Sequence, residues 1–231
     1  MTGQNLTNSG YATSGRKILE IAKQYNLDGD YFPVWATCLG FELMMMEDSK
    51  RNDILTKCKG QDQASPLMFE KDLQPLRKSG KMFENLTTSM FQVMKDKDVT
   101  INYHGWCLTK TNFNESDLRN KYKILAINHD EENLEYISIV EGIHYPFYGV
   151  QFHPEKPLFE FVSKKNHCNI PHDNDAIQSG QYFANFFLNE CRKSNHVFNP
   201  DMHRDRLIYN FQPDYTIDFA NYEQMYFFPL K

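Results

Sequence analysis

The chain contains 231 residues with a formal net charge of −5, and 41% of the residues are hydrophobic and 24% charged. This length and composition predict a single globular domain over residues 1–231 with a sizeable core. The acidic balance argues against a nucleic-acid-binding protein, which would carry a basic face. No apolar run approaches the ~20 residues that span a bilayer, so no membrane partner is expected.

The first predicted element is an amphipathic helix over residues 11–26, whose apolar face includes Ile18, Leu19 and Ala22. A turn at residues 28–30 leads into residues 31–37. That run is short, apolar and rich in aromatic and β-branched residues, which predicts a strand buried on both faces. A second helix is expected to begin at Cys38, directly after this strand.

The later part of the chain alternates strands and helices. Residues 49–120 are polar and show no clear pattern, whereas residues 136–140 and 148–153 predict two strands. Residues 173–175 supply N-cap residues for a helix that continues through Lys193. The alternation favours an α/β sandwich with a mostly parallel central sheet. The aromatic tail over residues 209–230 is expected to pack as an extension.

The five cysteines fit neither a disulfide framework nor a paired zinc ribbon. They are widely spaced and contain no Cys-x-x-Cys pair. Because their number is odd, at least one thiol stays unpaired in a fully oxidised monomer, so one candidate reactive cysteine is expected. The positions are Cys38, Cys58, Cys107, Cys168 and Cys191.

Cys38 stands at the predicted junction of strand and helix, with the small residues Ala36 and Gly40 on either side. Small neighbours are typical of a nucleophile elbow, a tight turn that lifts the side chain above the carboxyl edge of a sheet. The amino end of the following helix would favour a thiolate, and the Leu39 N–H would be free to donate to an oxyanion. A buried core cysteine explains Cys38 alone equally well.

His153 supplies the second part of a catalytic set. It ends a predicted strand, where the active-site residues of open α/β sheets gather. Pro154 restricts His153 to extended backbone geometry, and Glu155 is close enough to accept a proton from the imidazole. An elbow cysteine with a held histidine and a carboxylate indicates a nucleophile, a base and an orienting group.

Two segments resemble the γ-glutamyl hydrolase family of the class I glutamine amidotransferase-like superfamily. Residues 32–42 read Phe-Pro-Val-Trp-Ala-Thr-Cys-Leu-Gly-Phe-Glu, and residues 148–156 read Tyr-Gly-Val-Gln-Phe-His-Pro-Glu-Lys. Further likeness at residues 11–12, 102–106 and 186–190 extends the resemblance over nearly the whole chain. It implies a three-layer α/β/α sandwich.

The resemblance also implies a hydrolase that removes γ-linked glutamates from folylpoly-γ-glutamates, a small-molecule substrate, with no metal or organic cofactor. Cys38 would attack the γ-carbonyl, His153 would act as the base, and Glu155 would be the third member of the set. His104 matches a family histidine near the substrate pocket, although a surface or loop histidine fits it equally well. Whether the protein forms a homodimer is left open.

Enzymes of this family act in lysosomes or after secretion, and the resemblance implies the same location here. Residues 1–7 have neither the basic start nor the apolar run of a signal peptide. Three glycosylation sequons support secretion only weakly, because about two would arise by chance in a chain of this composition. They begin at Asn5, Asn85 and Asn114.

The sequence departs from the family pattern in two places. Ala36 stands where the elbow usually has glycine, which is acceptable if the position does not require a positive φ. Met1 aligns within a glycine-rich loop that follows about two β–α units of ~30 residues each in the family. Those N-terminal strands are therefore expected to be missing, which leaves the elbow strand at an unpaired edge. Gly3 is then the one remaining candidate for a second oxyanion donor, whose loss would cost on the order of 3 kcal/mol.

Two other functions remain open. A glutaminase domain that feeds ammonia to a synthetase would read Cys-x-Gly-x-Gln, whereas Glu42 ends the motif here, so the hydrolase fits better. An inactive binding homologue could keep the pocket without the oxyanion loop. The presence of Cys38, His153 and Glu155 argues against long-standing degeneration.

Overall fold

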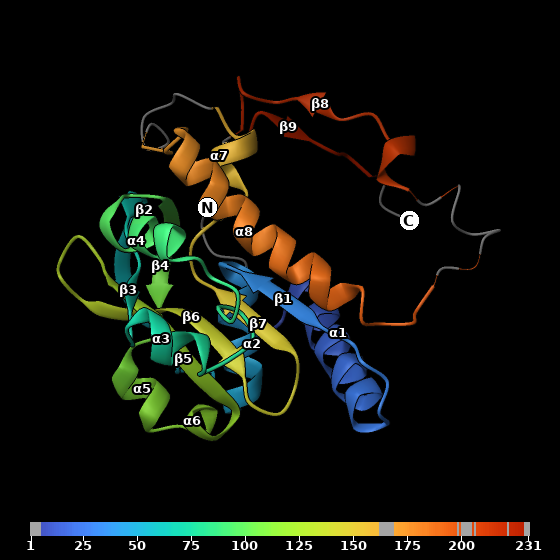
Figure 1. Ribbon diagram of the computed structural model, residues 1–231. Helices are drawn as coiled ribbons and strands as arrows, with labels where there is room; N and C mark the ends of the chain where they lie inside the picture. Colours follow the sequence, from blue (N-terminus) through green and yellow to red (C-terminus); the bar gives the residue numbers. More distant parts are fainter. Residues whose placement is uncertain are drawn as a thin grey trace.

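The computed structural model describes residues 6–161, 169–197, 199, 205, 207–220 and 222–228. A five-stranded sheet with the order β1-β7-β6-β5-β3 forms the centre, and helices cover both of its faces (Figure 1). The strands are β1 (Val34–Thr37), β7 (Phe147–Val150), β6 (Glu135–Gly142), β5 (Tyr122–His129) and β3 (Met68–Phe69).

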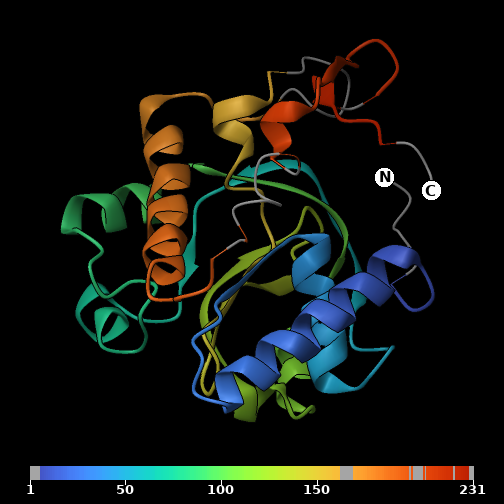
Figure 2. The same cartoon turned by 90° about the vertical axis from the view of Figure 1, so that its right-hand side faces the viewer.

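Helices α1 (Gly10–Leu27) and α2 (Leu39–Ser49) cover one face of the sheet, and the long helix α8 (Asn174–Cys191) lies on the opposite face (Figure 2). The Ser9 side chain caps α1 by accepting a hydrogen bond from the Ala12 N–H, and α1 confirms the helix predicted over residues 11–26. The short helices α5 (Lys110–Asn114) and α6 (Leu118–Lys121) add to this layer. Its core joins helices to the sheet through Leu19, Ala22, Phe41, Met44, Met45, Val140 and Phe147.

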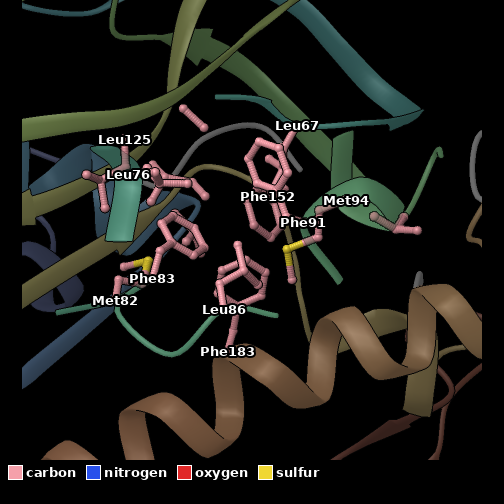
Figure 3. Packing of buried hydrophobic residues seen from close by; sticks show 14 of the residues in the cluster. Leu67, Leu76, Met82, Phe83, Leu86, Phe91, Met94, Leu125, Phe152 and Phe183 are labelled. Atoms are coloured by element: carbon pink, nitrogen blue, oxygen red, sulfur yellow. The ribbon is translucent and has the colours of Figure 1, made fainter. Parts of the chain in front are cut away.

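Helix α8 (Asn174–Cys191) covers the opposite face, together with α3 (Leu73–Arg77) and α4 (Thr88–Asp96). Asp173 caps α8 by accepting hydrogen bonds from two backbone N–H groups, so the predicted start of this helix is confirmed. Phe183 points from α8 into an apolar cluster (Figure 3). That cluster includes Leu67, Leu76, Met82, Phe83, Leu86, Phe91, Met94, Leu125 and Phe152. Helices on both faces of one sheet confirm the predicted α/β class.

The sheet is mixed, so the expectation of a mostly parallel sheet is wrong. Among the described strands of this sheet, only β1 and β7 run parallel, whereas β7 with β6, β6 with β5, and β5 with β3 are antiparallel. The length of the connections is the reason. Short segments at residues 130–134 and 143–146 join β5 to β6 and β6 to β7, and a short turn can join only antiparallel neighbours.

β1 lies at the edge of the sheet. Among the described strands it pairs only with β7, with Ala36 opposite Gly149, which agrees with the unpaired edge expected beside the elbow strand. β1 is shorter than the predicted run, and only Ala36 within it is buried, so the expected burial on both faces is wrong. β7 also ends early, at Val150, so His153 lies in the loop after the strand.

The polar middle of the chain forms a separate antiparallel pair, β2 (Thr56–Ser65) and β4 (Thr100–Cys107). A disulfide joins Cys58 on β2 to Cys107 on β4. Cys38 and Cys191 are free thiols, so the described cysteines include unpaired ones, as the odd number requires. Cys168 lies outside the described residues.

The C-terminal tail folds partly onto α7 (Lys156–Phe159). It contains the 3-10 helix η1 (Ile208–Asn210) and a hairpin of β8 (Asp214–Tyr215) and β9 (Gln224–Met225). The Glu223 N–H donates to the Glu160 carboxylate at 3.2 Å, whereas Tyr209 and Phe219 are 89% and 72% exposed. This hydrogen bond joins the hairpin to the end of α7, but Tyr215 within the hairpin is also exposed, so the expectation that the aromatic tail packs as an extension is wrong for most of its side chains. No helix of the described ranges has both the length and the apolar character to cross a membrane.

Candidate active site

Cys38 occupies the turn between β1 and α2, as the elbow prediction requires. Its backbone angles, φ 50° and ψ −107°, lie in a region that residues with a side chain rarely adopt. The Cys38 N–H donates to the Val150 carbonyl at 2.9 Å, and the Cys38 carbonyl accepts from the Glu42 N–H at 2.9 Å. These two bonds hold the strained turn against β7 on one side and the first turn of α2 on the other.

Small residues leave room around Cys38. Ala36 lies in β1 and is not among the residues with positive φ, so alanine is tolerated at this position. A Cβ atom at Gly40 would lie 3.5 Å from the Tyr11 hydroxyl and 3.9 Å from the Ala36 Cβ. Both distances are ordinary van der Waals contacts, so the structure leaves room for a small side chain at position 40 as well.

The Cys38 thiol is protonated at neutral pH in this structure. Burial raises its pKa to about 12, and the charge of Glu42 adds to the shift, while the Leu39 N–H opposes it. Cys38 is only 8% exposed, so desolvation outweighs the amino end of α2. The amino end of α2 does favour the thiolate through the Leu39 N–H, as expected, but burial has the larger effect on the pKa. Attack therefore requires transfer of the thiol proton to a base.

Glu42 shares the electrostatic environment of Cys38. It is 4% exposed, and its Oε1 accepts a hydrogen bond of 3.1 Å from Gln151 Nε2. Burial raises the pKa of Glu42 to about 7, although the hydrogen bond from Gln151 lowers it. Glu42 is therefore neutral in mildly acidic solution and becomes charged as the pH rises above 7.

His153 is oriented by Glu155. The imidazole Nδ1 and Glu155 Oε1 are 2.7 Å apart, and the His153 N–H donates to the Ile101 carbonyl at 2.8 Å. Burial opposes ionisation of Glu155, but the hydrogen bond with His153 and its charge lower the Glu155 pKa on balance. Because an ionised Glu155 carboxylate can only accept a hydrogen bond, the His153 Nδ1 beside it carries a proton. The other ring nitrogen, Nε2, can then accept a proton.

Strand β4 places Tyr103 against both the thiol and the imidazole. The Tyr103 carbonyl oxygen lies 3.9 Å from Cys38 Sγ, and its ring meets the His153 ring edge-on with centroids 6.1 Å apart. Between Cys38 Sγ and the His153 ring, both in the described part of the chain, there is no direct hydrogen bond. Catalytic hydrogen bonds are often long until substrate binds, so the structure brings the two groups to one region without joining them.

His104 lies in the interior of β4, where it is 3% exposed. The alternative of a surface or loop histidine is therefore wrong, and direct contact with substrate has no support in this position. Its Nδ1 lies 3.4 Å and 3.5 Å from the sulfurs of Cys58 and Cys107, and its Nε2 lies 3.3 Å from Asn102 Oδ1. Burial lowers the His104 pKa to about 3, so the ring is neutral. Its contacts with neighbouring side chains help to pack β4.

Of the two oxyanion donors named above, the structure describes one. Leu39 is the first residue of α2, and a hydrogen bond from its backbone N–H lowers the pKa of the Cys38 thiol. Gly3 lies outside the described residues.

Cys58, His104 and Cys107 also have the spacing of a metal site, the one such group found in the described ranges. The two sulfurs form a disulfide, whereas a metal ion binds thiolates. In this oxidised form the group does not offer a pair of thiolate ligands.

An apolar cavity of about 600 Å³ opens beside the base. His153 and Glu155 line it together with Trp35 from the edge strand and Phe183 and Phe187 from α8. A space of this size is large enough for a drug-sized ligand. The cavity therefore offers an apolar surface next to the imidazole.

Two residues near Cys38 were missed by the sequence argument. Lys156 begins α7 and is 4% exposed, and Tyr222 belongs to the C-terminal hairpin. The Lys156 Nζ lies over the Tyr222 ring, 4.9 Å from its centroid, and both side chains interact electrostatically with Cys38. The position of Lys156 directly after Glu155 was a usable signal, whereas that of Tyr222 depends on tertiary folding.

Known proteins resemble this chain over nearly its whole length. The family described as "Glutamine amidotransferase class-I" matches residues 10–164. The gamma-glutamyl hydrolase of Rattus norvegicus is 37% identical over 98% of this chain and 69% of its own length, and that of Homo sapiens 37% over 97% and 68%. Gamma-glutamyl hydrolase B of Dictyostelium discoideum is 34% identical over 91% of this chain and 59% of its own length. The chain therefore belongs to the class-I glutamine amidotransferase family and, within it, to the gamma-glutamyl hydrolases.

Proposed function

We propose that this chain hydrolyses the γ-glutamyl amide bonds of folylpoly-γ-glutamates through an acyl-enzyme on Cys38. The observation that carries the proposal is the hydrogen bond of 2.9 Å from the Cys38 N–H to the Val150 carbonyl. This bond connects the strained turn at Cys38 to β7, the strand that precedes His153 and Glu155 in the chain. The similarity to gamma-glutamyl hydrolases supports the substrate class.

Acylation begins with proton transfer. Because the resting thiol has a pKa of about 12, His153 Nε2 takes its proton as the sulfur attacks the γ-carbonyl carbon. Glu155 holds the ring and stabilises the imidazolium that forms. The tetrahedral intermediate then loses its amine as His153 returns the proton to the leaving nitrogen, and a thioester remains.

Deacylation uses the same groups with water as the nucleophile. His153 removes a proton from water as it attacks the thioester, and Cys38 regains a proton when the second intermediate collapses. The Leu39 N–H is the donor proposed for both oxyanions. A donor of this kind contributes about 10²–10³ in rate.

We also propose a lysosomal or extracellular location. Disulfides such as Cys58–Cys107 form and persist in oxidising compartments, and Asn85 and Asn114, which begin two of the sequons, are exposed. Fractionation of cells that make the full-length protein should recover it from lysosomes or the medium. Recovery from the cytosol alone would contradict this proposal.

The activity is tested with pteroylpenta-γ-glutamate and, separately, with free glutamine, by measuring released glutamate. The protein should release glutamate or short γ-glutamyl peptides from the first substrate, and Cys38→Ala should abolish the release. Cys191→Ala, which removes the other described free thiol, is the matched control and should remain active. Turnover of glutamine without turnover of the polyglutamate would favour a glutaminase, and turnover of neither would favour an inactive homologue.

A further inference from the structure

Two cysteines and a histidine converge where β2 pairs with β4. His104 Nδ1 lies 3.4 Å from the sulfur of Cys58 on β2 and 3.5 Å from that of Cys107 on β4. In the described ranges these side chains are the one group whose ligand atoms lie close enough together to hold a metal ion. Because the two sulfurs form a disulfide in the oxidised chain, the group becomes available to a cation only after reduction.

The positions of the three donor atoms fit a tetrahedral zinc site. Zn–S bonds of about 2.3 Å and a Zn–N bond of about 2.0 Å place sulfur and nitrogen about 3.5 Å apart at the tetrahedral angle, and the imidazole nitrogen already has this separation from both sulfurs. The same geometry requires the two thiolates to lie about 3.8 Å apart. The Cα atoms of Cys58 and Cys107 are 5.9 Å apart, so rotation about the Cα–Cβ bonds can provide this spacing after reduction.

Asn102 orients the imidazole for metal binding. Its Nδ2 donates to the Gln63 carbonyl at 3.2 Å, so Oδ1 is the amide atom that faces His104 Nε2, at 3.3 Å. A carbonyl oxygen can only accept a hydrogen bond, so the proton of the neutral ring lies on Nε2 and the lone pair of Nδ1 points toward the sulfurs. A histidine that binds a metal ion through one nitrogen usually donates a hydrogen bond from the other in this way.

The surroundings of the group suit a divalent cation. Two thiolates balance its charge, so the occupied site is neutral and can be buried. The charge of the nearby Asp130 carboxylate acts on His104. Burial opposes ionisation of Asp130, but hydrogen bonds from three backbone N–H groups lower its pKa on balance. Cys107 is buried and Cys58 is half-buried, so solvent and ions reach the site from one side.

We propose that the reduced chain binds one Zn²⁺ ion through Cys58, His104 Nδ1 and Cys107, with water at the fourth position. Imidazole and thiolate ligands favour zinc among the divalent cations. Reduction oxidises two molecules of a thiol to their disulfide and converts both cysteines to thiols. Each cysteine then loses one proton as its sulfur binds the ion. The ion thus replaces the disulfide as the link between β2 and β4, independently of the proposed hydrolase.

The test uses the full chain with Cys38→Ala, Cys168→Ser and Cys191→Ser, which leaves only the two cysteines of the site. One portion is reduced with a phosphine, which is then removed under argon, and the other stays oxidised. The reduced chain should bind one Zn²⁺ per molecule, measured by competition with a coloured chelator, and release about two protons per ion at pH 7. The oxidised chain should bind at least about 100-fold more weakly. Equal binding by the two forms refutes the site.

Single variants of this chain assign the ligands. Cys58→Ser and His104→Gln should each weaken binding by more than about 100-fold, because loss of a group that only orients a ligand already costs about 10- to 100-fold. Asn102→Ala should weaken it by that smaller factor. His129→Gln is the matched control, because His129 has no described contact with either sulfur, and it should bind normally. Co²⁺ in place of Zn²⁺ should give a thiolate charge-transfer band and a tetrahedral spectrum, and an octahedral spectrum would contradict the ligand set.

Urea unfolding shows whether the ion binds the folded chain. A ligand that binds only the folded state raises the free energy of unfolding. Zn²⁺ should therefore shift the urea midpoint of the reduced chain toward that of the oxidised chain, and it should leave the oxidised chain unchanged. The chain with Cys58→Ser and Cys107→Ser should not respond. Binding to the reduced chain without a higher urea midpoint would mean that unfolded cysteines hold the ion, and the proposed site would be wrong.

Discussion

The Cys38 N–H donates to the Val150 carbonyl at 2.9 Å, and this bond continues the parallel pairing of β1 with the last residue of β7, one residue beyond the end of β1. In that pairing Thr37 lies opposite Val150. The position of the candidate nucleophile is therefore an extension of the register of the sheet. Its position relative to His153 depends on backbone hydrogen bonds more than on contacts between the two side chains.

The strain at Cys38 should be measurable as stability. Glycine adopts φ 50° and ψ −107° without the clash that a Cβ atom causes. We expect Cys38→Gly to have a free energy of unfolding higher than that of Cys38→Ala by about 1 kcal/mol, while both variants are inactive. Urea unfolding of the two proteins checks this, and equal stability would show that the turn is relaxed.

The contact between Glu155 and His153 should matter for turnover. Glu155→Gln replaces an anion by an amide that no longer stabilises an imidazolium or fixes the tautomer. We expect kcat to fall by about 10²–10⁴-fold with little change in KM. Glu132→Gln, at an exposed carboxylate paired with Lys59, is the control. A loss of less than tenfold in Glu155→Gln would remove Glu155 from the catalytic set.

The parts of the fold that sequence could predict depend on local signals. The helix after Asp173 has both a capping side chain and an apolar period, and the structure begins it at Asn174. The turn at Cys38 was also predictable, because small residues and a change from strand to helix pattern occur together there. These features are determined by neighbours along the chain.

The parts that failed depend on residues distant in sequence. The disulfide between Cys58 and Cys107 spans a separation of 49 residues and requires the register of β2 with β4, which contains two irregularities. The burial of Lys156 depends on the hairpin that carries Tyr222. The mostly parallel sheet was inferred from alternation alone, without the hairpin connections that reverse the strands.

The stability of the protein should depend on pH through Glu42. Its pKa is raised from 4.5 to about 7 in the folded state, so the folded state binds this proton more tightly than the unfolded state does. The resulting stability is complete below pH 4.5 and is lost as the pH rises through 7, by an amount on the order of 3 kcal/mol. Glu42→Gln should flatten this fall, measured by urea unfolding between pH 4.5 and 8. Glu20→Gln, at an exposed site, should retain it.

Reduction of the disulfide should destabilise the fold. The bond between Cys58 and Cys107 closes a loop with a sequence separation of 49, which by loop entropy corresponds to about 4 kcal/mol. The double variant Cys58→Ser and Cys107→Ser should lose stability of this order in urea unfolding, and dithiothreitol should then have no further effect. If the wild-type chain unfolds at the same urea concentration with and without the reductant, the two sulfurs are not bonded in solution.

The last prediction concerns the spacing between β2 and β4. A Cβ atom at Gly60 would lie 2.6 Å from Cε1 and 2.8 Å from Nε2 of His104. The ring cannot move away easily, because it is 3% exposed and meets the Tyr136 ring with centroids 5.0 Å apart. Gly60→Ala must therefore push the two strands apart, at a cost of about 1–3 kcal/mol.

Displacement of β4 should also reach the candidate site. Tyr103 on β4 touches Cys38 through its carbonyl and His153 through its ring, so we expect Gly60→Ala to lower kcat as well as the free energy of unfolding. Gly105→Ala is the matched control on the same strand, because a Cβ atom there meets nothing within 4 Å, and it should change stability by no more than about 0.5 kcal/mol. Urea unfolding and glutamate release are measured for both. If the two variants behave alike, His104 does not set the distance between the strands, and the position of Tyr103 must be held by other contacts of β4.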